Sequence, residues 1–355
     1  MVIPSDLSPK RSICEGSQPV INVGLIGYGY WGPNLARNFS LNPDFKLASI
    51  CDFSADRLQR AGRFHPQAQL CGSVEEFFSN SRLDAVAIAT PVAAHYELAK
   101  RALESGRHVW LEAPMTETVA QAQDLIGLAQ AKNKKLLVDQ TLIYTGAVRK
   151  IKELIDKGEL GELVYYDSTR VNLGLFQQDV NVLWDLAPHD ISIMDYLLPF
   201  KKLAVSATGS SYYGNGLVPK SVLTVYMSGG RVAHINVSWV SPVKVRQTLI
   251  GGTSKMILYD DTEPSEKIKV YDKGVELNLG KEEVYHLKIQ YRVGDMYSPK
   301  IEDREALALE TQHFADCILR GEDPLTGGRA GLEVVKVLVA AEISLKQQGA
   351  PVELA

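Results

Sequence analysis

Residues 21–140 alternate short apolar runs with segments that carry apolar residues at helical spacing. The apolar runs lie at 21–26, 45–51, 69–71, 83–89, 108–111 and 135–139, and each predicts a strand. The segments between them predict helices, among them 55–64, 74–80, 95–104 and 118–131. Six alternations of strand and helix are typical of a doubly wound parallel sheet with helices on both faces.

The pattern changes after residue 146. An amphipathic helix is predicted at 147–157, and strands then follow without crossover helices at 164–166, 203–207, 221–227, 232–240, 246–250, 256–259 and 267–271. One predicted helix, 187–198, interrupts them, and helices 304–320 and 331–348 close the chain. We therefore predict a second α/β domain with an open, mostly antiparallel sheet, one face of which helices or another subunit must cover. The predicted division is a mobile tail at 1–20, a first domain at 21–145 and a second at 146–355.

A glycine turn follows the first apolar run and opens into a helix. Its sequence is Gly27-Tyr28-Gly29-Tyr30-Trp31-Gly32. In such a turn the first glycine permits the tight bend, the second lets backbone approach a pyrophosphate, and the third lets the helix pack on the strand. A phosphate then lies at the helix N-terminus, where unpaired N–H groups and the helix dipole favour an anion.

The next predicted strand ends in Asp52, 20 residues after Gly32. A carboxylate at about this distance accepts hydrogen bonds from the ribose hydroxyls of NAD and repels a 2′-phosphate. We therefore predict NAD as the cofactor. The alternative is a glycine turn in a doubly wound domain that binds no dinucleotide.

The net charge and the residue composition limit the classes of partner that the protein can bind. The net charge of the 355-residue chain is −4 and no block of basic residues occurs, which argues against a nucleic-acid or membrane-surface partner. No apolar run reaches the roughly 18 residues of a membrane span. The four cysteines, Cys14, Cys51, Cys71 and Cys317, lie far apart without zinc-site spacing, so we expect reduced thiols in a cytoplasmic protein and no metal site.

A second group of polar residues lies in the segment 184–190, where Asp185 and His189 are four residues apart. We expect Pro188 in the first turn of the helix that follows, and Asp185 or a near neighbour as its cap. A carboxylate beside an imidazole orients the ring and stabilises the imidazolium, which suits a base that takes a hydroxyl proton. The alternative is an N-cap aspartate and a hydrogen-bonded core histidine.

Together these motifs resemble the Gfo/Idh/MocA oxidoreductases, named for glucose–fructose oxidoreductase and inositol dehydrogenase. The resemblance covers residues 21 to about 348 and rests on the glycine turn with Asp52, on Thr90-Pro91 followed by His95, on 106–109, on Glu112-Ala113-Pro114, on Asp185 with His189, and on 321–324. Residues 28–35 and 184–190 look like the nucleotide-sugar branch, whose members resemble UDP-N-acetylglucosamine 3-dehydrogenases and ketosugar reductases.

The resemblance implies a Rossmann domain and a C-terminal α/β domain whose open sheet forms a homodimer or homotetramer interface. It also implies that nicotinamide lies near Glu112, Pro114 and the Asp185–His189 segment. His189 would be the acid/base, and Asp185 would be its partner or a hydrogen-bonding contact of the substrate. The cofactor contacts it implies are Gly27, Gly29, Tyr30, Trp31, Gly32, Asp52, Thr90, Pro91, His95, Glu112, Pro114 and Gln140.

One position departs from the family pattern. The family motif is Glu-Lys-Pro, and its lysine usually contacts the sugar hydroxyl and the nicotinamide, whereas Ala113 stands here. Three interpretations are open: a natural member in which His189 suffices, a relative that binds cofactor without turnover, or an engineered lysine-to-alanine form. The Ala113–Pro114 bond is a candidate cis peptide.

Substrate contacts are predicted in the first strand of the second domain and in the loop 174–181. The candidates are Arg170, Asn172, Asn181 and Trp184, with Lys244 and Arg246 as possible partners of a nucleotide diphosphate. For the charged residues the alternative is a solvated charge on a strand edge.

These predictions amount to an NAD-dependent oxidoreductase that acts on a secondary alcohol or ketone of a sugar, at C3 of a nucleotide-linked sugar. Two alternatives stay open: a non-catalytic NAD-binding sensor or scaffold of the same fold, and a dehydrogenase of inositol or a free sugar.

Overall fold

A computed structural model describes residues 20–174, 180–211, 217–278 and 288–354 of the protein, which form two compact units. The N-terminal unit takes the chain up to Leu111 together with Leu128–Leu137 and Leu307–Pro324. The C-terminal unit contains Glu112–Gly127, Val138–Ala306 and the residues from Leu325 onward. The chain therefore passes between the units several times, where the sequence predicted one boundary near residue 145. The predicted tail at 1–20, apart from Val20, and Cys14 lie outside the described residues.

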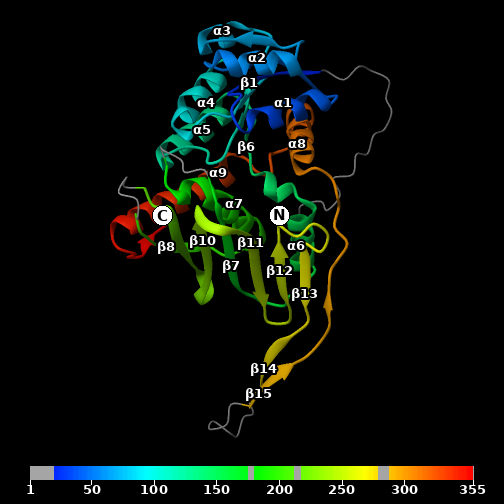
Figure 1. Cartoon of the computed structure of the whole chain (residues 1–355), viewed down its shortest axis with the longest axis vertical. Coiled ribbons are helices and arrows are strands. Elements are labelled where there is room, and N and C mark those ends of the chain that lie inside the picture. The colour runs from blue at the N-terminus through cyan, green and yellow to red at the C-terminus, as the bar shows by residue number, and fades with distance from the viewer. Residues whose placement is uncertain (1–19, 175–179, 212–216, 279–287, 355) are drawn as a thin grey trace. The chain divides into compact units, whose positions relative to one another are not determined.

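A six-stranded sheet with the order β3-β2-β1-β4-β5-β6 forms the N-terminal unit (Figure 1). Its strands are β1 Ile21–Ile26, β2 Phe45–Cys51, β3 Gln69–Cys71, β4 Ala85–Ile88, β5 His108–Leu111 and β6 Leu136–Val138. The connecting helices are α1 Gly32–Leu41, α2 Ala55–Phe64, α3 Val74–Ser79, α4 His95–Glu104 and α5 Val119–Ala131. β1 pairs in parallel with both β2 and β4, so the direction of winding reverses between β1 and β4. Ligands of doubly wound sheets bind at the carboxyl end of the strands at this point.

A late helix, α8 (Ala306–Arg320), completes the core of the N-terminal unit. Its Phe314 ring lies 5.6 Å from that of Trp110 in β5, and Trp110 lies 5.4 Å from Phe39 in α1. Such edge-to-face pairs add about 0.5–1.5 kcal/mol beyond the area they bury. The sequence predicted this helix but assigned it to the second domain, because periodicity identifies an apolar face without identifying what covers it.

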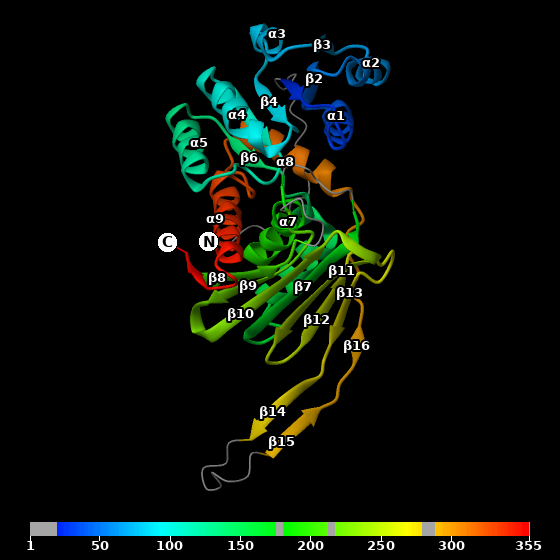
Figure 2. The same cartoon turned by 60° about the vertical axis from the view of Figure 1, so that its left-hand side comes forward.

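The C-terminal unit has a nine-stranded sheet with the order β16-β13-β12-β11-β7-β10-β9-β8-β17, and β14 and β15 form a separate hairpin (Figures 1 and 2). The strands are β7 Leu163–Leu173, β8 Lys202–Gly209, β9 Lys220–Met227, β10 Arg231–Ser238, β11 Val240–Gly252, β12 Met256–Asp260, β13 Ile268–Tyr271, β14 Gly274–Asn278, β15 Lys288–Arg292, β16 Met296–Tyr297 and β17 Val352–Glu353. Within the described residues of this nine-stranded sheet, β7 and β10 pair in parallel and the other neighbouring strands pair antiparallel, so the predicted mostly antiparallel sheet is confirmed. Strands β14 to β17 were not predicted.

Helices α6 (Gly146–Asp156), α7 (Val182–Leu197) and α9 (Gly328–Lys346) cover one face of this sheet (Figure 2). In β9 the residues on that face, Leu223 and Val225, are fully buried. Val222 and Tyr226 alternate with them and are each 38% exposed. One face of the sheet is therefore core, and the other is open within this chain.

Helix α7 begins earlier than the sequence predicted. It starts at Val182, and the side chain of Asn181 caps it by accepting a hydrogen bond from the Leu183 N–H at 2.9 Å. Pro188 therefore lies inside the helix instead of in its first turn, and Asp185 is a first-turn residue instead of the cap. Val182 and Leu183 are fully buried. Their packing sustains the turns before Pro188 although an interior proline costs about 3 kcal/mol.

None of the helices in the described ranges combines the length and the apolar character that crossing a bilayer requires.

Asn181→Ala is expected to lower the free energy of unfolding by about 1 kcal/mol, because the helix loses its cap. Asn181→Ser keeps a capping oxygen and should stay within a few tenths of a kcal/mol of the parent. Urea denaturation followed by circular dichroism measures both variants. Equal stabilities of the alanine and serine variants would contradict the capping role.

Candidate functional site

The glycine turn in the N-terminal unit has two glycines that the fold itself requires. Gly27 has φ +96°, and a Cβ placed there would lie 2.4 Å from the carbonyl oxygen of Ala89. A Cβ on Gly32 would lie 2.3 Å from the carbonyl oxygen of Gly27. Gly29 is different, because the nearest atom to its hypothetical Cβ is a nitrogen of Arg57 at 3.8 Å. The protein leaves space at Gly29, where a dinucleotide pyrophosphate would approach.

Asp52 is held beside this turn by backbone donors. Its Oδ2 accepts a hydrogen bond from the Tyr28 N–H at 2.8 Å, and its Oδ1 accepts one from the Ser54 N–H at 2.9 Å. The guanidinium of Arg57 lies 3.6 Å from Oδ2. The sequence placed Asp52 correctly at the end of β2 but gave no sign of Arg57.

The other predicted cofactor residues of this unit surround the same strand ends. Tyr30 is 91% exposed, whereas Trp31 packs against the core of the unit. His95 is buried, and its Nε2 lies 2.8 Å from the carbonyl oxygen of Thr90. The Thr90 hydroxyl is buried and has no hydrogen-bond partner among the described residues. Pro91, next to it, is exposed. An unpaired buried hydroxyl beside an open glycine turn fits a polar ligand at this position.

The segment that carries the family departure belongs to the C-terminal unit. The Ala113–Pro114 peptide bond is cis, as the sequence suggested, and Pro114 is buried. Glu112 and Ala113 are partly buried, and the methyl group of Ala113 offers neither charge nor a hydrogen bond. Gln140, buried, follows β6 and precedes a 3-10 turn at Thr141–Tyr144.

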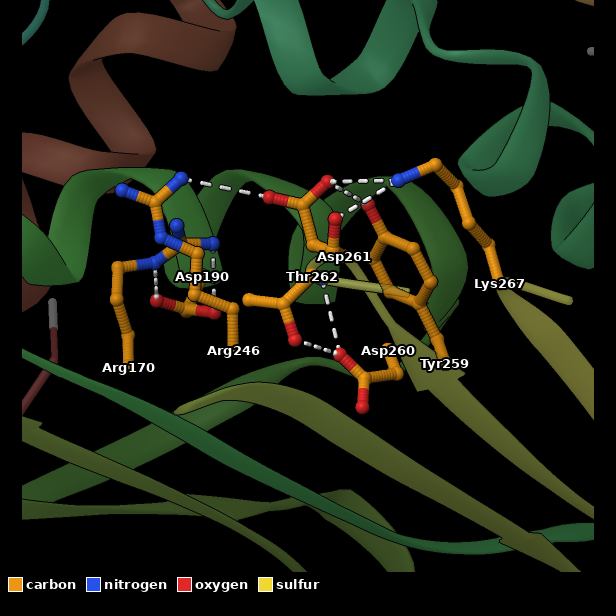
Figure 3. A network of polar contacts seen from close by, with 8 residues as sticks. All are labelled: Arg170, Asp190, Arg246, Tyr259, Asp260, Asp261, Thr262 and Lys267. Atoms are coloured by element: carbon orange, nitrogen blue, oxygen red, sulfur yellow. Dashed lines mark hydrogen bonds and ion pairs between the residues drawn. The ribbon is translucent and has the colours of Figure 1, made fainter. Parts of the chain in front are cut away.

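A buried ion pair joins α7 to β7 in the same unit. The Nε of Arg170 donates to Asp190 Oδ2 at 2.6 Å, and Nη2 donates to Oδ1 at 3.3 Å (Figure 3). The Ser168 hydroxyl donates to Oδ1 at 2.5 Å. The two charged side chains are only 5% and 2% exposed. The alternative of a solvated edge charge is therefore wrong for Arg170, because β7 lies between β11 and β10 in the interior of the sheet.

A second group of charges continues this pair across the neighbouring strands (Figure 3). Arg246 in β11 is the register partner of Arg170, and its Nη1 lies 3.4 Å from Asp261 Oδ2. The Tyr259 hydroxyl donates to Asp261 Oδ1 at 3.2 Å, and Lys267 Nζ donates to the Asp261 carbonyl oxygen at 2.8 Å. The sequence singled out Arg246 but missed Asp190 and Asp261. The position of Asp190 directly after His189 was the one signal that could have identified it.

His189 lies beside this network and is partly buried. Burial lowers the pKa of His189 to about 4, and the positive charges of Arg170 and Arg246 act in the same direction. Asp190 and Asp139 oppose them. His189 is therefore neutral at pH 7, and no hydrogen bond to its ring is found within the described residues. A neutral imidazole with its nitrogens available can accept a proton.

Asp139 is positioned by its own turn. Its Oδ1 accepts hydrogen bonds from the Thr141 N–H at 3.1 Å and from the Thr141 hydroxyl at 2.5 Å. It is 3% exposed. The sequence did not single it out, although it ends a predicted strand next to Gln140.

The remaining predicted residues contact other parts of the C-terminal unit. Asp185 Oδ2 accepts a hydrogen bond from Trp239 Nε1 at 2.7 Å, and Trp184 Nε1 donates to Glu342 Oε2 at 3.1 Å. Asn181 caps α7, and Asn172 is partly exposed in β7. The carboxylates that raise the pKa of His189 are Asp190 and Asp139, so the partnership of Asp185 with His189 stays a prediction.

Gly29→Ala is expected to leave the thermal midpoint within about 2 °C of the parent while weakening NADH binding at least tenfold, because the added methyl group enters space that only the ligand needs. Gly32→Ala is the contrasting variant and should destabilise the fold, since its methyl group would clash with backbone. Thermal denaturation and NADH fluorescence titration measure the two effects. Full NADH affinity in Gly29→Ala would contradict the proposed approach of the pyrophosphate.

Comparison with known protein families gives a match for each of two consecutive segments of the chain. Residues 21–140 match the family model described as "Oxidoreductase family, NAD-binding Rossmann fold". Residues 148–258 match the GFO/IDH/MocA C-terminal domain.

Individual relatives agree with these matches. The uncharacterized oxidoreductase YdgJ of Escherichia coli is 31% identical over 53% of this chain, and the match covers about half of its own length, 56%. The scyllo-inositol 2-dehydrogenase (NAD⁺) of Bacillus subtilis is 24% identical over 94% of this chain and 95% of that protein. The fold is similar to that of UDP-N-acetylglucosamine 3-dehydrogenase GnnA from Acidithiobacillus ferrooxidans, with a TM-score of 0.76, 22% identity and coverage of 92% of this chain and 98% of that one. The chain therefore belongs to the Gfo/Idh/MocA family of oxidoreductases, with an NAD-binding Rossmann domain followed by the C-terminal domain of that family.

Proposed function

We propose that this oxidoreductase interconverts a secondary alcohol and a ketone of a sugar, at C3 of a nucleotide-linked sugar, with His189 as the acid/base. The observation that carries the proposal is the position of His189, whose ring has no hydrogen bond within the described residues and which directly precedes Asp190 of the buried ion pair. Burial lowers the pKa of His189 to about 4, so the ring is neutral. The activities of two relatives, an inositol dehydrogenase and a nucleotide-sugar dehydrogenase, support a polyhydroxylated ring as substrate.

NAD, which the glycine turn and Asp52 would hold, would when bound supply the hydride chemistry of the reaction. His189 takes the hydroxyl proton of the substrate on a ring nitrogen in the oxidative direction and returns it in the reductive direction. Asp190 and Asp139 stabilise the imidazolium, because both carboxylates act on His189 with the opposite sign to the arginines. Proton transfer by a positioned group typically contributes about 10²–10⁴-fold in rate.

Burial and the positive charges of Arg170 and Arg246 keep His189 neutral, so that its ring can accept a proton. Asp190 is bound to Arg170 on one side and adjoins His189 in the sequence, so movement of the histidine backbone would disturb a buried ion pair. Neutral His189 accepts a proton without first having to lose one at pH 7. His189 is for the same reason a weak base, since its pKa of about 4 lies well below neutral pH.

Ala113 favours a second candidate, a relative that binds NAD without turnover. Alanine cannot orient a hydroxyl group or compensate negative charge, so this position contributes nothing to transition-state stabilisation. A dehydrogenase of inositol or a free sugar is a third candidate, which differs from the first only in substrate.

We also propose that two or four copies associate through the open face of the nine-stranded sheet, where Val164, Val222 and Tyr226 are exposed. Cys51, Cys71 and Cys317 are buried free thiols, in keeping with the proposed cytoplasmic location.

Ala113→Lys is expected to raise kcat on a panel of UDP- and dTDP-sugars at least tenfold above the parent, because a lysine can hydrogen-bond the reacting oxygen. Turnover is followed by NADH fluorescence. The matched control combines His189→Asn with Ala113→Lys. This double variant should lose the increase in kcat, since the amide of asparagine cannot take a proton. Equal rates with and without His189 would contradict its acid/base role, and NADH binding without any turnover in all variants would favour the sensor.

A further inference from the structure

The carboxylate that should select NAD is recessed in this protein. The Asp52 side chain is only 3% exposed, and each of its oxygens already accepts a backbone N–H, from Tyr28 and from Ser54. An aspartate that discriminates against a 2′-phosphate must present its negative charge to the ribose. Here both oxygens are used to fix the glycine turn and the start of α2.

Arg57 presents the exposed charge at the same place. Its side chain is 47% exposed, and its Nη1 lies 3.6 Å from Asp52 Oδ2. The same nitrogen is the atom nearest to the open space at Gly29. The guanidinium therefore lies between the carboxylate and the region that the glycine turn leaves for the dinucleotide.

Arg60 adds a second positive charge one turn further along α2. Its Nη2 donates to the carbonyl oxygens of Tyr28 and Gly29, at 3.3 and 3.4 Å. The guanidinium also lies 5.5 Å from the centre of the Tyr28 ring, and Tyr28 is buried. Arg60 is thus fixed to the glycine turn, whereas Arg57 has the freedom to move toward a ligand.

We propose that the nucleotide site also accepts NADP(H), and that Arg57 is the residue that binds the 2′-phosphate. Arg57 lies 3.6 Å from Asp52, and Arg60 is hydrogen-bonded to the glycine turn. A 2′-phosphate, which carries nearly two negative charges, therefore meets two guanidinium groups beside this turn. Arg57 can turn from Asp52 to the phosphate and bind it through two parallel N–H groups. Asp52 keeps its two backbone hydrogen bonds in either state, so the turn remains in place.

Fluorescence titration of the parent protein with NADH and with NADPH tests the proposal without any need for a substrate. We expect the two dissociation constants to lie within about tenfold of each other. Arg57→Gln should weaken NADPH binding at least tenfold and leave NADH binding within about twofold, because only NADPH carries the group that Arg57 binds. The NADPH affinity of the parent should also fall more steeply with added salt than the NADH affinity.

Two variants separate this role from general effects of charge or folding. Arg63, exposed in the last turn of the same helix, provides the matched control, and Arg63→Gln should change neither affinity. Arg57→Lys keeps the charge and should retain part of the NADPH affinity. NADPH binding more than about a hundredfold weaker than NADH binding in the parent would overturn the proposal. So would an equal loss of both affinities in Arg57→Gln, because Arg57 would then contact the adenosine that the two cofactors share.

Discussion

The buried ion pair between Arg170 and Asp190 is the interaction on which the C-terminal unit depends. It joins the central strand β7 to α7 through two hydrogen bonds between side chains that are almost inaccessible to solvent. Removing one partner of such a pair typically destabilises a protein by about 3–5 kcal/mol, because the other charge is left buried and uncompensated. Ser168 uses a further acceptor position of the same carboxylate. The geometry of α7 near His189 is therefore determined by electrostatics as well as by apolar packing.

Burial of His189, together with the positive charges of Arg170 and Arg246, sets its protonation. Because folding lowers its pKa from the ordinary value of 6.5 to about 4, the folded protein favours the neutral ring. As the pH falls from 6.5 to 4, the unfolded chain takes up a proton at this residue before the folded chain does, so this contribution to stability is complete above pH 6.5 and is lost over that interval. A histidine kept neutral in this way is available as a proton acceptor across the physiological range. Asp190 and Asp139 then stabilise the charge that proton uptake creates.

Much of this architecture could be predicted from the sequence, and the exceptions have physical causes. The six parallel strands, the glycine turn and Asp52 follow from local patterns, because glycine conformation and burial of continuous apolar runs are decided by neighbouring residues. The start of α7 could not be predicted from Pro188, since the packing of Val182 and Leu183 outweighs the local penalty. Arg170 was assigned to solvent or to a substrate because its partner Asp190 lies 20 residues away and the sheet order that buries both is not encoded locally. Arg57 was missed for a similar reason: a helix residue that meets a strand end is visible only once both elements are placed.

The central claim is that burial, aided by the positive charges of Arg170 and Arg246, keeps His189 neutral until the pH is close to 4, and a direct titration tests this claim. The C–H resonances of His189, assigned by comparison with His189→Asn, can be followed by NMR from pH 8 downward. The account predicts no change in these resonances until about pH 5 and a midpoint near 4. A midpoint at the ordinary histidine value of about 6.5 or above would contradict it, because the ring would then be substantially protonated where it is supposed to accept a proton.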